Sequence, residues 1–225
     1  MQITINTLNR EEILRYLGYQ GTQIPTHLNA LIDRCITETL ETISPKYLYR
    51  RIALETNDQG IGIKDTSITL VSKDLQEHLK NCREAYLFCG TLGNEMDRLI
   101  RRKMLSDPDE GVILDSCAST AIEAVADAVE KQLSQDVSKE GFHLTWRFSP
   151  GYGDWSISFQ KDFLEFLDAH RKIGLTTNSS MLLTPGKSVT AILGISDTAK
   201  DPRPNKCDFC NNRSHCPFRK RGTQC

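Results

Sequence analysis

The spacing of apolar residues limits the possible folds most, because its period changes repeatedly along the chain. Apolar residues recur at helical spacing between residues 25 and 43, and again between residues 107 and about 134. Short apolar runs of strand length occupy residues 84–90 and 188–195. The regular strand–helix alternation of a parallel βαβ sheet does not occur. The pattern therefore predicts an α+β fold with helices packed around a largely antiparallel, twisted sheet.

Local signals add further elements to this prediction. Asn9 and Glu12 have the N-cap and N3 chemistry of a helix start, Gly18 ends that helix, and Ser72 caps a helix that reaches residue 79. His78 is placed on the surface of the latter helix. The remaining elements are strands at residues 47–54, 61–68 and 142–148, and helices at residues 95–105 and 159–170.

Charge and hydropathy exclude several classes of protein. The chain has 28 Lys and Arg against 29 Asp and Glu, and a net charge of −1 argues against generic nucleic-acid binding. No apolar run approaches the roughly 20 residues of a membrane helix. The first residues lack the basic and apolar parts of a signal peptide. We therefore expect a cytoplasmic protein with neither a nucleic acid nor a membrane as its partner.

The eight cysteines fall into two groups. Four are scattered through apolar segments, where Cys35 and Cys89 are interpreted as core thiols. The other four crowd the end of the chain and are the candidate metal ligands: Cys207, Cys210, Cys216 and Cys225. In a reducing compartment, clustered cysteines indicate metal binding more readily than disulfides. A proline after the third of them is typical of iron–sulfur loops, and zinc is the alternative metal.

A stiff, proline-containing linker at residues 201–204 precedes these cysteines. The segment from residue 200 onward is basic, whereas the rest of the chain is acidic. We therefore divide the chain into an α+β domain at residues 1–199 and a cysteine-rich, metal-binding tail at residues 200–225.

The segment Arg147-Phe148-Ser149-Pro150-Gly151-Tyr152-Gly153-Asp154 carries the most chemistry. Arg147 has the planar fork that grips a carboxylate with two hydrogen bonds. Gly151 and Gly153 let the main chain touch a ligand without an intervening Cβ, and Tyr152 offers a ring to cover it. The residue types alone leave two interpretations open: a ligand site, or an ordinary strand-to-helix turn with a solvated arginine.

This segment resembles the Arg-Pro-Ala-Pro-Gly-Tyr signature of the activation domain of cobalamin-dependent methionine synthase. The likeness continues through Ile173-Gly174 and through Pro-Gly-Lys-Ser-Val-Thr at residues 185–190. Upstream it includes residues 92–99 and the alanine-rich helix that carries Glu123. The chain departs from the family at Asn178-Ser179-Ser180, where the family has a Thr-[Asp/Glu]-Ser triplet with one acidic residue. It also departs in replacing a tyrosine-rich segment with the cysteine tail.

The resemblance implies a site for S-adenosylmethionine, which in that family supplies a methyl group once the cobalamin has oxidised to cob(II)alamin. It implies that Arg147 pairs with the methionyl carboxylate and that Ser149 and Gly151 make main-chain contacts. It also implies that Tyr152 packs on the ligand and that Glu123 meets its amino or sulfonium charge. Read without the resemblance, Glu123 is equally well a solvated helix residue.

The resemblance further implies an activation subunit that acts in trans as an auxiliary component of a methionine synthase or related corrinoid protein. It would bind S-adenosylmethionine itself, meet cobalamin only through that partner, and rely on a separate electron donor. The alternative is an iron–sulfur electron-transfer or activator protein for a corrinoid methyltransferase, with a vestigial S-adenosylmethionine pocket. A purely structural interaction subunit is a third reading.

Overall fold

A computed structural model describes residues 3–19, 21, 23–57 and 60–199 of the chain. The four cysteines expected to bind metal, Cys207, Cys210, Cys216 and Cys225, lie outside the described residues. The division of the chain at residues 199 and 200 therefore stays a prediction.

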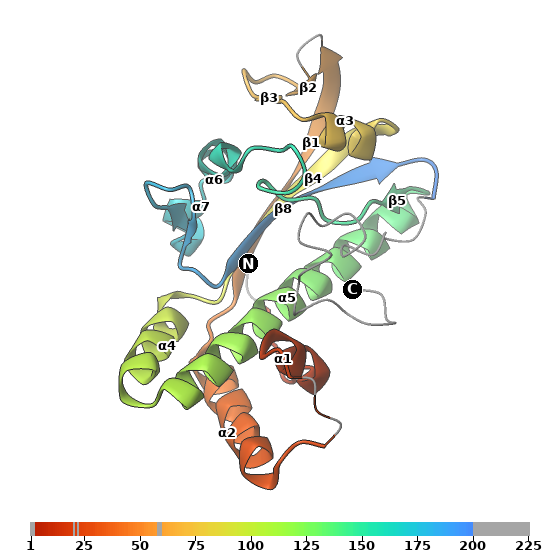
Figure 1. Ribbon diagram of the computed structural model, residues 1–225. Coiled ribbons are helices and arrows are strands. Elements are labelled where there is room, and N and C mark those ends of the chain that lie inside the picture. The colour runs from red at the N-terminus through yellow and green to blue at the C-terminus, as the bar shows by residue number, and fades with distance from the viewer. Residues whose placement is uncertain (1–2, 20, 22, 58–59, 200–225) are drawn as a thin grey trace. The chain divides into compact units, whose positions relative to one another are not determined.

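The described elements follow one another without regular alternation of strand and helix (Figure 1). In chain order they are α1 (Arg10–Tyr16), α2 (Thr26–Thr42), β1 (Lys46–Asn57), β2 (Gly60–Ile63), β3 (Thr69–Leu70), α3 (Lys73–Leu79), β4 (Cys82–Thr91), α4 (Asn94–Ser106), α5 (Pro108–Lys139), β5 (His143–Leu144), the 3₁₀ turn η1 (Ile157–Phe159), α6 (Gln160–Leu167), α7 (Ala169–Ile173), β6 (Thr176–Thr177), β7 (Leu183–Thr184) and β8 (Ser188–Ser196).

The described strands form a six-stranded sheet in the order β3-β2-β1-β4-β8-β5, and β6 pairs with β7 in a small second sheet. Every pair of neighbouring strands is antiparallel. The two longest ladders join β4 to β1 on one side and to β8 on the other. The predicted α+β class with a largely antiparallel sheet is confirmed.

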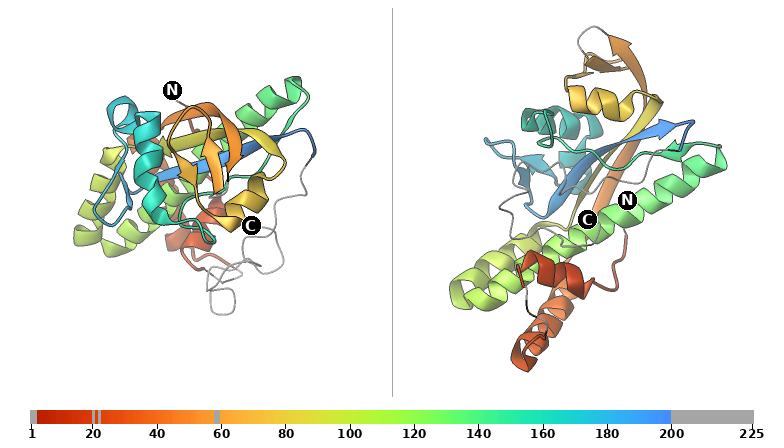
Figure 2. Two further views of the ribbon diagram at one scale, coloured as in Figure 1. Left: turned by 90° about the horizontal axis from the view of Figure 1, so that it is seen from above. Right: turned by 45° about the vertical axis from the view of Figure 1, so that its right-hand side comes forward.

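Helices cover both faces of β4, which explains why its residues 85–90 form a continuous buried run rather than an alternating pattern. Leu87 belongs to a buried cluster that includes Leu75 of α3 and Phe163 of α6. Phe88, the next residue, points to the opposite face and packs in a cluster with Leu133 of α5. Figures 1 and 2 show α5 on one side of the strands and α6 and α7 on the other.

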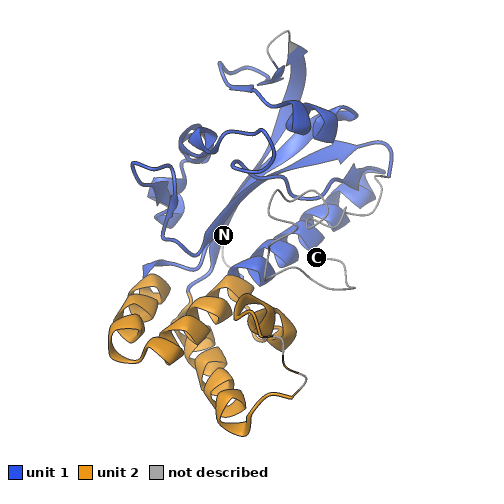
Figure 3. Ribbon diagram, viewed as in Figure 1, with its two compact units in different colours: residues 1–4, 44–94, 122–200 blue, residues 5–43, 95–121, 201–225 orange. Residues whose placement is uncertain are grey.

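The chain divides into two compact units (Figure 3). One unit is built mainly from residues 44–94 and 122–200 and contains the sheet. The other is built mainly from residues 5–43 and 95–121 and contains α1, α2, α4 and the first part of α5. Cys35 is fully buried in this helical unit. Glu123 and residues 147–154, which carry the predicted site, all belong to the unit with the sheet.

The predicted strand at residues 142–148 is wrong in its length. Only His143 and Leu144 form a ladder with β8, and Phe148 rejoins β8 through an isolated bridge to Ile192. Between these points the N–H of Gly194 donates to the side-chain oxygen of Thr145, at 2.8 Å, instead of to a main-chain carbonyl. A side-chain hydrogen bond between residues far apart in the sequence thus interrupts the regular ladder.

The single helix predicted at residues 159–170 is also wrong, because Asp168 divides it into α6 and α7. Asp168 has φ of 56° and ψ of 39°, and its N–H donates to Glu165 and Leu164 as the C-cap of α6. A left-handed residue in this position ends a helix.

The cysteines interpreted as core thiols are buried as expected. Cys35 and Cys89 are both fully inaccessible to solvent, and burial raises the pKa of each thiol to about 12. Such thiols stay protonated near neutral pH and are poor nucleophiles. A packing role is therefore sufficient to explain both residues.

Candidate functional site

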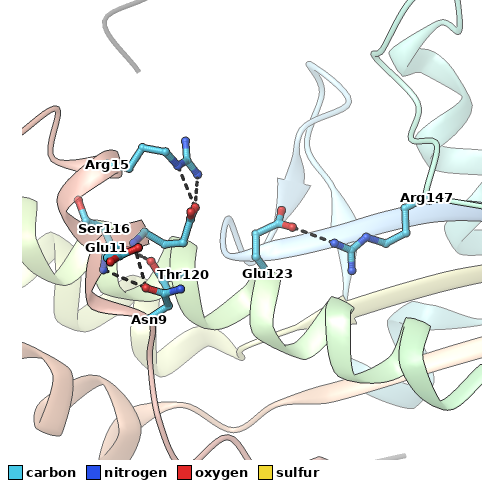
Figure 4. A network of polar contacts seen from close by, with 8 residues as sticks. Asn9, Glu11, Arg15, Ser116, Thr120, Glu123 and Arg147 are labelled. Atoms are coloured by element: carbon cyan, nitrogen blue, oxygen red, sulfur yellow. Dashed lines mark hydrogen bonds and ion pairs between the residues drawn. The ribbon is translucent and has the colours of Figure 1, made fainter. Parts of the chain in front are cut away.

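Arg147 lies where the chain runs beside β8 after leaving β5. Its neighbour Phe148 is held by reciprocal main-chain hydrogen bonds with Ile192, at 3.0 and 2.8 Å, and packs against the core cluster of α3 and α6. Adjacent residues of an extended segment point in opposite directions. The side chain of Arg147 is accordingly directed toward α5 (Figure 4).

Three carboxylates of α5 surround the guanidinium of Arg147. Its Nη2 lies 3.1 Å from Oε2 of Glu123 and 2.7 Å from Oδ1 of Asp127, and its Nε lies 3.3 Å from Oε2 of Glu130. Positions i, i+4 and i+7 form one stripe along a helix, so these side chains reach a common point. The structure thus brings together two predicted site residues, Arg147 and Glu123, and adds two that the sequence analysis missed.

One nitrogen of Arg147 lacks an acceptor. The side chain is only 5% exposed, and its Nη1 atom is buried without a hydrogen-bond partner among the described residues. Buried donors are nearly always paired in folded proteins, so this atom marks a place for an acceptor. Three carboxylates also approach the guanidinium, so both signs of charge meet at this point. The arrangement suits a ligand with both a carboxylate and positive charge.

The other predicted site residues lie in the turn that follows Arg147. The N–H of Tyr152 donates to the carbonyl of Ser149 at 3.2 Å, and the N–H of Gly151 donates to the carbonyl of Trp155 at 2.8 Å. Gly151 has a φ of 92°, a conformation that glycine adopts without strain. The side chain of Trp155 is buried, whereas Tyr152 is 61% exposed. The turn therefore has a fixed core and an outward-facing tyrosine.

Asp154 ties this turn to the first residues of α3. Its carboxylate accepts hydrogen bonds from the Ser72 hydroxyl and from the main-chain N–H of Lys73, at 2.8 Å, and of Asp74, at 3.2 Å. In return, the Asp154 N–H donates to the carboxylate of Asp74 at 3.0 Å. The hydrogen bonds from Ser72 and Lys73 lower the pKa of Asp154 below its ordinary value of 3.8.

The contact between this turn and α3 requires a glycine at position 153. Its φ is 55°, and a Cβ atom at this position would overlap the carboxylate of Asp74. The missing side chain therefore allows the turn to approach α3. The two glycines of the motif consequently have different neighbours, because a Cβ at Gly151 would meet only Ile157, at 3.7 Å.

The residues that replace the family's Thr-[Asp/Glu]-Ser triplet form the turn between β6 and β7. The side-chain oxygen of Asn178 accepts from the N–H groups of Ser180 and Leu182, at 2.9 and 3.0 Å. Asn178 and Ser179 also line a hollow of about 560 Å³ beside α6 and α7. None of the five predicted binding residues lines that hollow, so the structure does not join it to Arg147.

The described residues contain no group of three or more His, Cys, Asp or Glu side chains arranged to hold a metal ion. None of their helices is long and apolar enough to cross a membrane. The metal-binding prediction concerns the last cysteines of the chain and is therefore untested.

The fold and the site define an α+β module with an arginine buried against an acidic helix. No protein-family model matches the sequence, and no curated protein matches it. Among solved structures, the chain is similar to the MetH reactivation domain bound to AdoHcy, with a TM-score of 0.62 and 14% identity. The match covers 90% of this chain and 79% of that one. At this identity the comparison shows a shared fold.

Replacing Asp154 should loosen the turn where it meets α3. In Asp154→Ala we expect the amides of Lys73 and Asp74 to exchange hydrogen about fivefold faster, because these two N–H groups at the start of α3 lose their acceptor. Hydrogen exchange read by mass spectrometry measures this, with the exposed Asp162→Ala as the matched control. Equal exchange in the two variants would contradict the anchoring role.

The contact between the Asp154 carboxylate and the first residues of α3 should depend on pH. Because the folded-state pKa of Asp154 is depressed, its stabilising effect is complete above the ordinary value of 3.8 and is lost as the pH falls through the lower folded value. The exchange difference between the wild type and Asp154→Ala should therefore disappear in strong acid.

Proposed function

We propose that this chain is an activation module that binds S-adenosylmethionine and presents it to the cobalamin of a methionine synthase or related corrinoid protein. One observation carries the proposal: the buried guanidinium of Arg147 has an unpaired Nη1 beside three carboxylates. S-adenosylmethionine has the matching charges, a carboxylate together with an amino group and a sulfonium. The fold shared with the MetH reactivation domain, solved with AdoHcy, supports the same ligand class.

In the proposed complex, the methionyl carboxylate accepts hydrogen bonds from Nη1 of Arg147. A charge-assisted bond of this kind is among the stronger ones available to a ligand. Glu123 lies 3.1 Å from the same guanidinium, so the amino or sulfonium charge placed beside it remains close to the carboxylate. The two ends of the methionyl group would thus be held by residues from α5 and from the segment beside β8.

The turn after Arg147 would hold the rest of the ligand. The N–H of Gly151 is engaged by Trp155, so contact there would use the open Cα face of the glycine, and Ser149 would contribute its main chain. The ring of Tyr152, which is 61% exposed, would close over the bound molecule. Asp154 would act indirectly, by fixing the turn against α3.

The partner supplies the methyl acceptor. S-adenosylmethionine provides the methyl group, and an electron donor first reduces the partner's inert cob(II)alamin. We propose that this exchange takes place in the cytoplasm and that cobalamin reaches the module only on the corrinoid protein. The alternative of an iron–sulfur activator with a vestigial pocket gains no support from the described residues or the comparisons, and we do not adopt it.

Arg147 should dominate ligand affinity. Losing a charge-assisted contact costs about 1.5–3 kcal/mol, so Arg147→Ala should weaken S-adenosylmethionine binding roughly 10- to 100-fold in a calorimetric titration. Arg147→Lys should recover part of the affinity, because lysine keeps the charge but lacks the fork. Arg171→Ala is the matched control, since that side chain is 82% exposed. An unchanged dissociation constant in a folded Arg147→Ala protein would remove Arg147 from the site.

We also propose that the final cysteines bind a metal ion or an iron–sulfur cluster independently of the ligand site. The proposal rests on their spacing, since thiolates two residues apart can face one ion and two more complete a tetrahedral set. Cys207 and Cys210 supply the close pair, and Cys216 and Cys225 supply the remaining ligands.

The double variant Cys207→Ser, Cys210→Ser should lose the metal while keeping affinity for S-adenosylmethionine. Metal analysis of protein purified without oxygen measures the first effect, and a ligand titration measures the second. Cys82→Ser is the control, because Cys82 is a cysteine of the α+β domain and not of the tail. Less than about one iron or zinc per wild-type chain would refute metal binding. Loss of both properties together would instead make the tail part of the ligand site.

A further inference from the structure

His78 is a buried titratable side chain that the proposed function does not use. It lies near the end of α3 and is only 3% exposed. Its Nε2 shares a hydrogen bond of 2.9 Å with the hydroxyl of Thr145. Its ring stacks on Trp146, with centroids 3.9 Å and planes 3° apart, and its centroid lies 5.3 Å from that of Phe148. The imidazole therefore contacts the residues on both sides of Arg147.

Arg147 is directed the other way, toward α5. Its Nη2 lies 2.7 Å from Oδ1 of Asp127 and 3.1 Å from Oε2 of Glu123. The helix α5 thus holds the guanidinium, while His78 of α3 holds the main chain from which the guanidinium projects. The place of the buried, unpaired Nη1 atom consequently depends on both helices.

The hydroxyl of Thr145 joins the imidazole of His78 to the sheet. It accepts a hydrogen bond from the N–H of Gly194 in β8, at 2.8 Å, and the N–H of Thr145 donates to the carbonyl of Gly194, also at 2.8 Å. Buried hydrogen-bonded groups of this kind favour a single arrangement, because each group left unpaired would be costly. The contact with His78 therefore fixes the chain just before it reaches Arg147.

We propose that His78 is a positioning residue of the ligand site, an inference that rests on the proposed function. It fixes the main chain on each side of Arg147 and thereby the place of the Nη1 donor, without touching the ligand itself. The same helix also holds the far end of the segment, because Asp154 accepts from the N–H groups of Lys73 and Asp74. A small displacement of a binding group weakens binding even when the group is unchanged, so its supporting contacts affect affinity.

The test compares two ligands that differ in the group Arg147 would bind. Decarboxylated S-adenosylmethionine keeps the sulfonium and the amino group but has no carboxylate. In calorimetric titrations, His78→Leu should weaken S-adenosylmethionine roughly two- to tenfold, the effect of one lost hydrogen bond, and leave the decarboxylated ligand nearly unchanged. Added to Arg147→Ala, the same substitution should no longer affect S-adenosylmethionine, because the donor that His78 positions is absent.

Three further variants separate positioning from general stability. Thr145→Val removes the other partner of the hydrogen bond and should produce the same selective loss, which keeps the test available if His78→Leu does not fold. His78→Gln has an amide that can bond to Thr145 and should regain part of the affinity lost in His78→Leu. Leu75→Ala is the matched control, since it removes another fully buried side chain of α3. It should lower the free energy of unfolding and preserve the ratio of the two dissociation constants.

The outcomes distinguish this inference from the proposed function. If His78→Leu or Thr145→Val weakened both ligands equally, or neither, while Arg147→Ala still weakened S-adenosylmethionine alone, the positioning role would be overturned and the ligand site would stand. The same change of ratio in Leu75→Ala would also overturn the positioning role. A folded wild type that binds neither ligand at millimolar concentration would overturn the proposed function itself, and the inference with it.

Discussion

The burial of both faces of β4 and β8 is the constraint on which the unit containing the sheet depends. It requires helices on each side, α5 on one and α3, α6 and α7 on the other. The segment after β5 runs along the edge of β8 between these layers, so alternate residues enter different environments. Phe148 joins the apolar cluster, and Arg147 meets the polar stripe of α5. The candidate site is thus a consequence of the sheet's position between two layers of helices.

Elements specified by local chemistry could be predicted from the sequence. The N-caps Asn9 and Ser72 bond to main-chain N–H groups two or three residues ahead, and both helices begin as expected. The errors arise where distant residues intervene. His78, placed on a helix surface, is buried and stacks on Trp146 with ring centroids 3.9 Å apart. Thr145 ends a ladder because its side chain bonds to Gly194, which no local pattern shows.

The candidate site likewise contains some residues that the sequence could predict and others that it could not. The chemistry of its segment singled out Arg147, the family resemblance added Glu123, and the two side chains meet in the structure. Asp127 carries a usable signal, its helical spacing from Glu123, but that spacing became informative only once α5 was known to face Arg147. Gly153 was expected to let the main chain touch a ligand, but its missing Cβ instead makes room for Asp74, which approaches from α3. Residues that act through long-range contacts need the fold before they can be understood.

The proposed function is delivery of a methyl group from S-adenosylmethionine to cobalamin on another protein. The most direct measurement uses S-adenosylmethionine labelled in its methyl group, a reductant and a cob(II)alamin methionine synthase without an activation region of its own. We expect this chain to raise the recovery of labelled methylcobalamin above that of a reaction without it, and Arg147→Ala to give no such increase. The same recovery with and without the chain would contradict the proposed function.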